Sequence, residues 1–367
     1  MKNNKKIIGY ALVIMMSVFL GSVGTYFLFK KFPLDVGNIV NVSKLEKEVT
    51  ITDEGIADAV DKVMDAVVIV NTYSNNKGIA SGTGFVYKID GDTAYILTNH
   101  HVIESGDKVN VVFTNNSVVE TKVVGSDKYA DIAVLSLKAN EVLSVAEIGS
   151  SSDSRVGDTV FAVGAPLDSA YSWTVTRGIV SGKDRMVAVS LSKNSTADWI
   201  MKVMQTDAAI NSGNSGGPLS NSNGQVIGVN SMKLISSGVE GMGFAIPIED
   251  AIDYANQLIM GGALNRPLLG VSLIELWDID SQYQVGISVD SSIEFGVIVA
   301  DAEKSGPAGV AGMKIGDVIT HINDVKIDSL ATLRYELFKH KAGDKITIKY
   351  IRDGSEKNAT VTLKSAT

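Results

Sequence analysis

The chain has 367 residues, of which 45% are hydrophobic and 20% are charged, so it is long enough for two globular domains and an additional segment. Its 35 glycines and 6 prolines favour a body of strands joined by tight turns over a disordered chain. The net charge of -8 argues against a nucleic-acid partner, and the absence of cysteine excludes disulfides, a thiolate nucleophile and cysteine-bound zinc.

The N-terminal segment is strongly apolar. Ile7–Phe29 contains 23 residues without a charge, and a helix of that length spans a bilayer core of roughly 30 Å. Three lysines lie within residues 1–6 and two more follow at 30 and 31, so the positive-inside rule places residues 1–6 in the cytoplasm and the rest outside. The alternative is a signal peptide cleaved near Ser22–Gly24. Because the apolar residues continue to Phe29, we expect a retained single-pass anchor in the cell membrane.

The chain after the anchor is predicted to contain a linker and a β-rich domain. Residues 30–52 are polar and lack periodicity, as in a linker. Over residues 53–262, a short helix is followed by many β-rich runs separated by turn residues, which predicts a sandwich or barrel. A helix at Glu249–Met260, stopped by a pair of glycines, closes this domain. The β-rich runs are Ala66–Val70, Gly82–Lys88, Ala94–Thr98, Lys108–Phe113, Ile132–Leu137, Thr159–Val163, Trp173–Ser181 and Gln225–Asn230.

A second domain of mixed α and β structure is predicted over residues 263–367. Its length is enough for a separate folding unit. One helix is expected at Leu330–His340. The expected strands are Leu269–Leu273, Gly296–Ala300, Val318–Ile322, Lys345–Tyr350 and Ala359–Leu363.

The segment most informative about function is Thr206–Leu219, which contains the sequence Gly-Asn-Ser-Gly-Gly at 213–217. A serine nucleophile needs an exposed hydroxyl beside backbone N–H groups directed at the oxyanion, and glycine permits the backbone of such a loop. One alternative is a Gly-rich hairpin with an incidental serine. Another is the G-x-S-x-G motif of an α/β-hydrolase esterase, but that fold requires a helix directly after the serine. Here Pro218 and the turn at Asn221–Gly224 lead to a strand instead.

A candidate base and a candidate orienting carboxylate precede this serine. His101 closes the strand-like run Ala94–Thr98, and Asp131 opens the run Ile132–Leu137. Taken separately, a lone histidine is more often a structural hydrogen-bonding residue, and an aspartate before a strand is usually a turn residue. Together with Ser215 they supply the groups of a Ser-His-Asp triad, in the chain order of chymotrypsin-like proteases.

Five segments that include these residues resemble the HtrA (Deg) family of serine proteases. They are Ser81–Phe85, Leu97–Val102, Asp131–Leu135, Gly213–Leu219 and Gly243–Pro247. The resemblance covers the chain from about Asp53 to its C-terminus. It implies a mainly β protein, with a chymotrypsin-like double β-barrel protease domain followed by a smaller α+β PDZ domain. It also implies a serine endopeptidase that acts on unfolded or damaged exported proteins, needs no metal or cofactor, and forms a homotrimer or larger homo-oligomer.

The same resemblance assigns roles in the site. It makes His101 the general base, Asp131 its orienter and Ser215 the nucleophile. It places the oxyanion hole at the backbone N–H groups of Gly213 and Ser215, with Asn214 between them.

The sequence departs from the family at a vicinal histidine pair. Family members usually carry Asn just before the catalytic histidine, where this chain has His100. The position relative to Val102 favours His101 as the base. Because neighbouring residues of a strand point to opposite faces, we expect only one of the two imidazoles to reach Ser215.

The residues expected to form the floor of the primary specificity pocket are Ala209 and Ile210, a few positions before the nucleophile. Neither is acidic, and a buried basic side chain without a counter-charge is unfavourable by several kcal/mol. We therefore expect cleavage after small or medium aliphatic residues rather than after Lys or Arg.

The second domain contains a segment that resembles the carboxylate-binding loop of PDZ domains. Such a loop binds the terminal carboxylate of a peptide with successive backbone N–H groups, after which the peptide adds as a strand. The alternative is the ordinary beginning of a strand. Ser305–Ala308 and Ile315–Ile319 also match the PDZ pattern, and the helix Leu330–His340 would form the far wall of the groove. The expected peptide-binding residues are Leu268, Leu269, Gly270 and Val271.

Three further hypotheses concern activity and its control. A proteolytically silent scaffold that only binds peptides is the main alternative function, and the intact set of His101, Asp131 and Ser215 argues against it. A metalloprotease lacks support because no His-Glu-x-x-His occurs. The long polar stretch Lys183–Trp199 is a candidate regulatory loop that senses an activating peptide.

Overall fold

The computed structural model describes residues 2–31, 54–164, 173–190, 197–231 and 241–365, which fall into two separate units, 1–51 and 52–367. The first unit contains α1 (Lys2–Lys31), a single helix. Its stretch Gly9–Leu28 is long and apolar enough to cross a membrane. The hydroxyls of Ser17 and Ser22 donate to carbonyls one turn earlier, at 2.7 and 2.6 Å, so these polar groups are satisfied within the helix. The expected linker lies almost entirely outside the described residues.

The second unit begins with α2 (Glu54–Met64) and a closed six-stranded barrel in the order β1-β2-β3-β6-β5-β4. Every neighbouring pair is antiparallel. Alternating apolar residues fill the interior, where Val70, Ile96, Val111 and Leu135 are completely buried. The strands are β1 (Val67–Ser74), β2 (Lys77–Asp90), β3 (Thr93–Thr98), β4 (Lys108–Val112), β5 (Val118–Asp127) and β6 (Ile132–Lys138).

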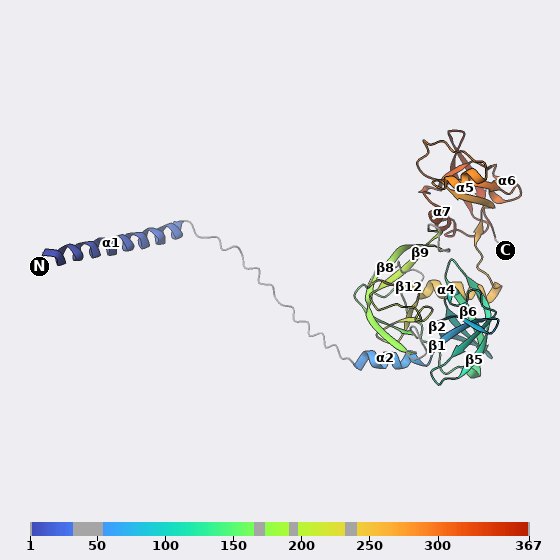
Figure 1. The fold of residues 1–367 in the computed structure, drawn as a ribbon, viewed down its shortest axis with the longest axis horizontal. Helices are drawn as coiled ribbons and strands as arrows, with labels where there is room; N and C mark the ends of the chain where they lie inside the picture. Colours follow the sequence, from blue (N-terminus) through green and yellow to red (C-terminus); the bar gives the residue numbers. More distant parts are fainter. Residues whose placement is uncertain (1, 32–53, 165–172, 191–196, 232–240, 366–367) are drawn as a thin grey trace. The chain divides into compact units, whose positions relative to one another are not determined.

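A second closed barrel follows, in the order β10-β11-β12-β9-β8-β7. Its core contains Ala162, Met204, Leu219 and Ile227. Figure 1 shows the two barrels, with the first in blue-green and the second in green to yellow. The strands are β7 (Thr159–Gly164), β8 (Thr174–Val189), β9 (Trp199–Thr206), β10 (Pro218–Asn221), β11 (Val226–Asn230) and β12 (Gly243–Pro247).

Helix α4 (Ile248–Gly261) links the barrels to the next domain and packs against β5, β6 and β11. Ala251, Ala255 and Leu258 recur at helical spacing and are fully buried. The helix ends where Gly262 takes a left-handed φ of 72° and donates its N–H to the Leu258 carbonyl at 2.8 Å. The pair of glycines therefore stops the helix as predicted.

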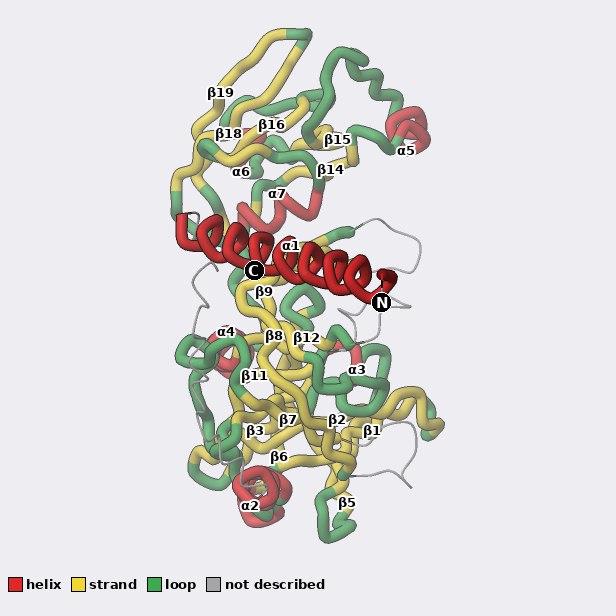
Figure 2. The backbone as a smooth tube through the Cα atoms, turned by 90° about the vertical axis from the view of Figure 1, so that its left-hand side faces the viewer, coloured by secondary structure: helices red, strands yellow, loops and turns green. Residues whose placement is uncertain are grey.

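The C-terminal domain contains a six-stranded sheet in the order β14-β15-β16-β18-β19, with β17 paired to β16, and three short helices. Its core contains Val299, Ile319, Leu333 and Ile348. Figure 2 shows this domain with α5, α6 and α7 in red. The elements are β13 (Pro267–Leu268), β14 (Val271–Glu275), α5 (Ile279–Gln284), β15 (Val297–Ala302), α6 (Pro307–Val310), β16 (Val318–Ile322), β17 (Val325–Lys326), α7 (Leu330–Leu337), β18 (Lys345–Arg352), β19 (Ser355–Thr362) and β20 (Lys364–Ser365).

Several sequence expectations need correction. The list of β-rich runs omitted β5, β9, β10 and β12, all of which are needed to close the two barrels. The expected strand Leu269–Leu273 is interrupted at Gly270, whose φ of 71° is outside the range of strands. The candidate regulatory loop Lys183–Trp199 is largely a hairpin: residues 183–189 continue β8 and Trp199 begins β9, while 191–196 lie outside the described residues.

Candidate active site

His101 lies on α3 (His100–Ile103), a single helical turn that begins directly after β3. Its imidazole Nδ1 is 2.9 Å from both carboxylate oxygens of Asp131. The backbone N–H of His101 also donates to Asp131 Oδ1 at 3.2 Å. The structure therefore brings the predicted base and the predicted orienting carboxylate together, with the other ring nitrogen, Nε2, directed away from this pair.

Asp131 is almost completely buried, at 1% exposure, and adopts an uncommon positive φ of 53°. Two residues that sequence reasoning missed hold it in place. Ser231 Oγ donates to Asp131 Oδ2 at 2.7 Å, and Asn99 Nδ2 donates to the Asp131 carbonyl at 2.8 Å. A buried carboxylate needs donors such as Ser231, and the Asn99 side chain holds the Asp131 backbone, so together they fix the position of the group that contacts His101.

His100 makes a separate set of contacts. Its Nδ1 is 3.0 Å from Ser126 Oγ, and its Nε2 is 3.8 Å from Glu104 Oε1. The pair lies on a helical turn rather than on a strand, so the physical reason given for their divergence was wrong. Successive helical residues are rotated by about 100°, which separates the two imidazoles as effectively as strand alternation.

The segment around Ser215 is a tight loop at the start of β10. Gly213 has a φ of 111° and Gly216 a φ of 83°, values that side-chain-bearing residues rarely adopt. The Ser215 carbonyl accepts from the N–H of Thr83 at 2.9 Å, and the Gly216 N–H donates to the Asn230 carbonyl at 2.8 Å. The loop is therefore anchored both to the first barrel and to its own.

Steric contacts place the serine loop against the turn that carries His101. A Cβ atom placed on Gly216 would lie 2.4 Å from Thr98 Oγ1 and 2.9 Å from the backbone nitrogen of Asn99. A Cβ atom on Gly82 would lie 2.6 Å from a methyl of Val102 and 3.1 Å from the Ser215 carbonyl oxygen. A side chain at either position would clash with these neighbours, which explains the glycines at 82 and 216. The site lies between the barrels, which is where a chymotrypsin-like protease has its triad.

Asn214 organises the serine loop from within. Its side-chain amide donates to the Ala209 carbonyl at 3.0 Å and accepts from the Asn211 N–H at 3.1 Å. Its own N–H donates to the Asn211 carbonyl at 3.2 Å. The backbone N–H of Asn214 is thus engaged inside the loop. The other two predicted oxyanion donors are the backbone N–H groups of Gly213 and Ser215.

The two residues expected in the specificity pocket have different surroundings. Ala209 is exposed, while Ile210 is 7% exposed and belongs to the core of the second barrel. A Cβ atom on Gly243 would lie 2.5 Å from Ile210 Cγ1, so the beginning of β12 closes over this side chain. The surroundings of Ile210 are apolar.

The predicted peptide loop of the second domain leads into an edge strand. Leu269 is buried, and Gly270 packs so closely that an added Cβ would lie 3.0 Å from the Gly306 Cα. The carbonyls of Leu269 and Gly270 accept from the N–H groups of Ala308 and Glu303, at 2.9 and 3.0 Å. β14 is an edge strand of the sheet and pairs with β15 along one side.

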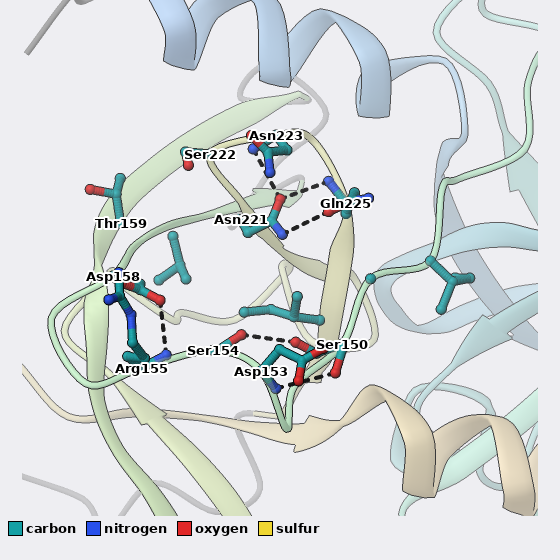
Figure 3. A pocket seen from close by; sticks show the side chains of 14 residues that line it. Ser150, Asp153, Ser154, Arg155, Asp158, Thr159, Asn221, Ser222, Asn223 and Gln225 are labelled. Atoms are coloured by element: carbon teal, nitrogen blue, oxygen red, sulfur yellow. Dashed lines mark hydrogen bonds and ion pairs between the residues drawn. The ribbon is translucent and has the colours of Figure 1, made fainter.

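A large polar pocket lies elsewhere on the second barrel, with a volume of about 700 Å³. Figure 3 shows that its side chains bind one another: Arg155 pairs with Asp158, and Asn221 with Gln225, at 3.1 Å in each case. None of the three predicted triad residues lines it. Within the described ranges, no group of three or more His, Cys, Asp or Glu side chains is arranged to hold a metal ion.

Comparison with known proteins agrees with this fold. A family model of the trypsin-like peptidase domain matches residues 82–229, and a model of the PDZ domain matches residues 267–363. The fold and site thus define a trypsin-like serine protease with a PDZ domain. The chain belongs to the HtrA family of serine proteases.

Relatives and solved structures support this assignment over most of the chain. The serine protease Do-like HtrB of Bacillus subtilis is 40% identical over 330 residues, covering 85% of this chain and 71% of the relative. The serine protease Do-like HtrA of Lactobacillus helveticus is 42% identical over 289 residues, covering 78% and 68%. The serine endoprotease of Yersinia pestis superposes with a TM-score of 0.62 at 29% identity, over 85% of this chain and 98% of that one. The HtrA-type protease AlgW with decapeptide gives the same TM-score and identity, over 85% and 99%.

Proposed function

We propose that the chain is a serine endopeptidase that uses Ser215 as nucleophile, His101 as general base and Asp131 as the group that orients His101. The observation that carries this proposal is the two-point contact of the His101 imidazole with the buried Asp131 carboxylate, beside the glycine-lined loop of Ser215. Burying a carboxylate carries a desolvation penalty, and a buried carboxylate that accepts from a histidine is typical of functional sites, which favours an active protease over a silent scaffold.

The proposed reaction proceeds through an acyl-enzyme. Ser215 Oγ attacks the carbonyl carbon of the scissile peptide and passes its proton to His101 Nε2, while the carbonyl oxygen becomes an oxyanion held by the N–H groups of Gly213 and Ser215. Collapse of this intermediate breaks the C–N bond, and His101 returns the proton to the departing amine. Water then repeats both steps on the ester and restores Ser215. Asp131 stabilises the imidazolium in each step.

The proposed substrates are unfolded or damaged exported proteins, cleaved after small or medium aliphatic residues. Support comes from the apolar surroundings of Ile210 and the close approach of Gly243, which offer no partner for a buried cation. We expect a map of cleavage sites in a reduced, unfolded protein to be dominated by Val, Ala and Ile on the N-terminal side of the cut. Mass spectrometry of the products would supply this map, and a predominance of Lys or Arg would contradict the pocket assignment.

The second domain, over about residues 263–367, is proposed to bind the free C-termini of peptides along the edge of β14, for substrate capture or activation. The AlgW relative, which was solved with a decapeptide, supports a peptide ligand. We expect a peptide with a hydrophobic C-terminal residue to bind more than about tenfold more weakly when its carboxylate is amidated, because the loop at Leu268–Val271 would then lose its charged acceptor. Fluorescence anisotropy measures this difference, and equal affinities would show that the carboxylate is not read.

The membrane arrangement completes the proposal. Residues 7–29 would form a retained anchor with residues 1–6 in the cytoplasm, and the protease domain, over about residues 53–262, would work outside the cell membrane as a homotrimer or larger assembly. The length and apolar character of α1 support the anchor. A protease-accessibility assay on intact cells would test the orientation.

A further inference from the structure

Four large apolar side chains are exposed within nine residues of the C-terminal domain. They are Trp277, Ile279, Tyr283 and Val285, at 57%, 65%, 86% and 48% exposure. With the acidic residues Asp278 and Asp280 between them, they form what we call the α5 surface. Single exposed apolar residues are ordinary, but such a concentration on one short segment is typical of an interaction site.

This surface is held in shape by hydrogen bonds beneath it. The Gln282 side chain, 6% exposed, donates to the Leu276 carbonyl at 2.7 Å. Asp278 caps α5 by accepting from the N–H and the hydroxyl of Ser281 at 3.0 and 2.6 Å. Ile279 and Tyr283 are four residues apart on the helix and so share one face. The apolar side chains are therefore presented by an ordered segment.

The charge around the surface selects among possible partners. Residues 276–296 contain four acidic residues and no Lys or Arg. Hydrogen bonds from the hydroxyl and the N–H of Ser281 lower the pKa of Asp278, and bonds from the N–H and hydroxyl of Ser292 lower the pKa of Asp290, which keeps both ionised. An identical second copy and an anionic lipid surface would both be repelled. A basic polypeptide with apolar residues is the complementary partner.

The position of the surface relates it to the proposed peptide groove. A peptide whose carboxylate binds at Leu268–Val271 must run antiparallel to β14, so its upstream residues reach the Glu275 end. β14 has five residues and spans roughly 17 Å, which the last five peptide residues would cover. Trp277 and α5 follow directly after that end, and Figure 2 shows α5 at the margin of the domain. Residues further upstream in the peptide therefore arrive beside the α5 surface.

We propose that the α5 surface binds the part of a C-terminal peptide upstream of its last five residues, and that it prefers Lys or Arg alternating with apolar residues there. This specificity rests on the proposed function of the domain as a C-terminal peptide receptor. Apolar side chains of the peptide would pack on Trp277 and Tyr283, and its basic groups would lie next to Asp278 and Asp280. The domain thereby selects unfolded basic, apolar chain ends.

The test compares labelled peptides on the full-length chain carrying Ser215→Ala, in detergent micelles, by fluorescence anisotropy. All peptides share the same last five residues with a free carboxylate. One has no extension, and the others carry a nine-residue extension of Lys and Leu, of Glu and Leu, or of Gly and Ser. We expect the Lys-Leu extension to tighten binding by at least about tenfold and the Gly-Ser extension by less than about twofold, with the Lys-Leu gain shrinking as ionic strength rises.

The triple variant Trp277→Ser, Ile279→Ser, Tyr283→Ser should lose the Lys-Leu gain and keep the affinity of the short peptide. Val310→Ser is the matched control, because Val310 is 73% exposed in the same domain and lies at the end of α6. A gain that survives in the triple variant, or equal gains from the Lys-Leu and Glu-Leu extensions, would overturn the α5 assignment. Failure of the short peptide to bind would instead contradict the groove, and the extended peptides would still report on the α5 surface.

Discussion

Replacing His101 by Ala is expected to lower the turnover rate by a factor on the order of 10⁴ to 10⁶, the range seen when a triad base is removed. The imidazole is the group proposed to receive the Ser215 proton, and its Nδ1 lies 2.9 Å from Asp131 Oδ1. Turnover of an unfolded protein substrate, measured after circular dichroism confirms folding, gives the factor.

His100→Asn is the matched control for this prediction, because His100 is the immediate neighbour of the same ring type. Its side chain contacts Ser126 and Glu104, whereas the His101 imidazole contacts the Asp131 carboxylate. We expect this change to reduce turnover by less than about tenfold, as local hydrogen bonds contribute only modestly. An inactive His100→Asn protein beside an active His101→Ala protein would show that the base has been misassigned.

Ser215→Ala is expected to lower turnover by a factor on the order of 10⁶, because the residual rate then depends only on substrate binding and the oxyanion donors. The change removes one hydroxyl, while the backbone bonds from Thr83 to Ser215 and from Gly216 to Asn230 remain. The thermal unfolding midpoint should therefore change little. Substantial turnover by a folded Ser215→Ala protein would exclude Ser215 as the nucleophile.

The sequence predicted the bounds of strands best where both faces of the strand are packed against other residues. β3, β6, β7 and β16 are apolar runs with β-branched residues, and their predicted bounds differ from the observed ones by at most one residue. β5 was missed because nine of its ten residues are exposed or half-exposed and they include Glu120 and Lys122, which weakens its apolar pattern. The requirement that β5 close the barrel is global and has no local signature in the chain.

In the candidate site, too, the residues within a local motif were predicted and those without one were missed. Its three principal residues were predicted because nucleophile, base and carboxylate each stand in a motif of restricted spacing. Ser231 was not predicted, because it supports Asp131 from 100 positions away and nothing local distinguishes it from any serine after a strand. Asn99 lies within the segment Leu97–Val102, but its role was not predicted. It donates to a main-chain carbonyl, a group that every residue has, so the sequence does not mark the partner.

The hairpin β8–β9 illustrates how tertiary context alters a polar stretch. Lys183–Val189 belongs to the long polar stretch that predicts a loop, yet Met186 and Val187 pair with Lys202 and Met201. At the start of β9, Trp199 packs on Phe338, the residue directly after α7, with ring centroids 5.1 Å apart. The neighbouring Asp198 carbonyl accepts from Arg334 at 2.6 Å. Contacts made by a domain that comes over a hundred residues later stabilise this hairpin.

The most direct test of the central claim is covalent labelling with a serine-directed phosphonate, followed by mass spectrometry of the digested protein. Only a hydroxyl activated by a neighbouring base and faced by oxyanion donors reacts quickly with such a probe. The account predicts a single adduct on Ser215 of the wild-type chain, strongly reduced labelling in His101→Ala and none in Ser215→Ala. An adduct on another residue, or labelling that persists in Ser215→Ala, would contradict it.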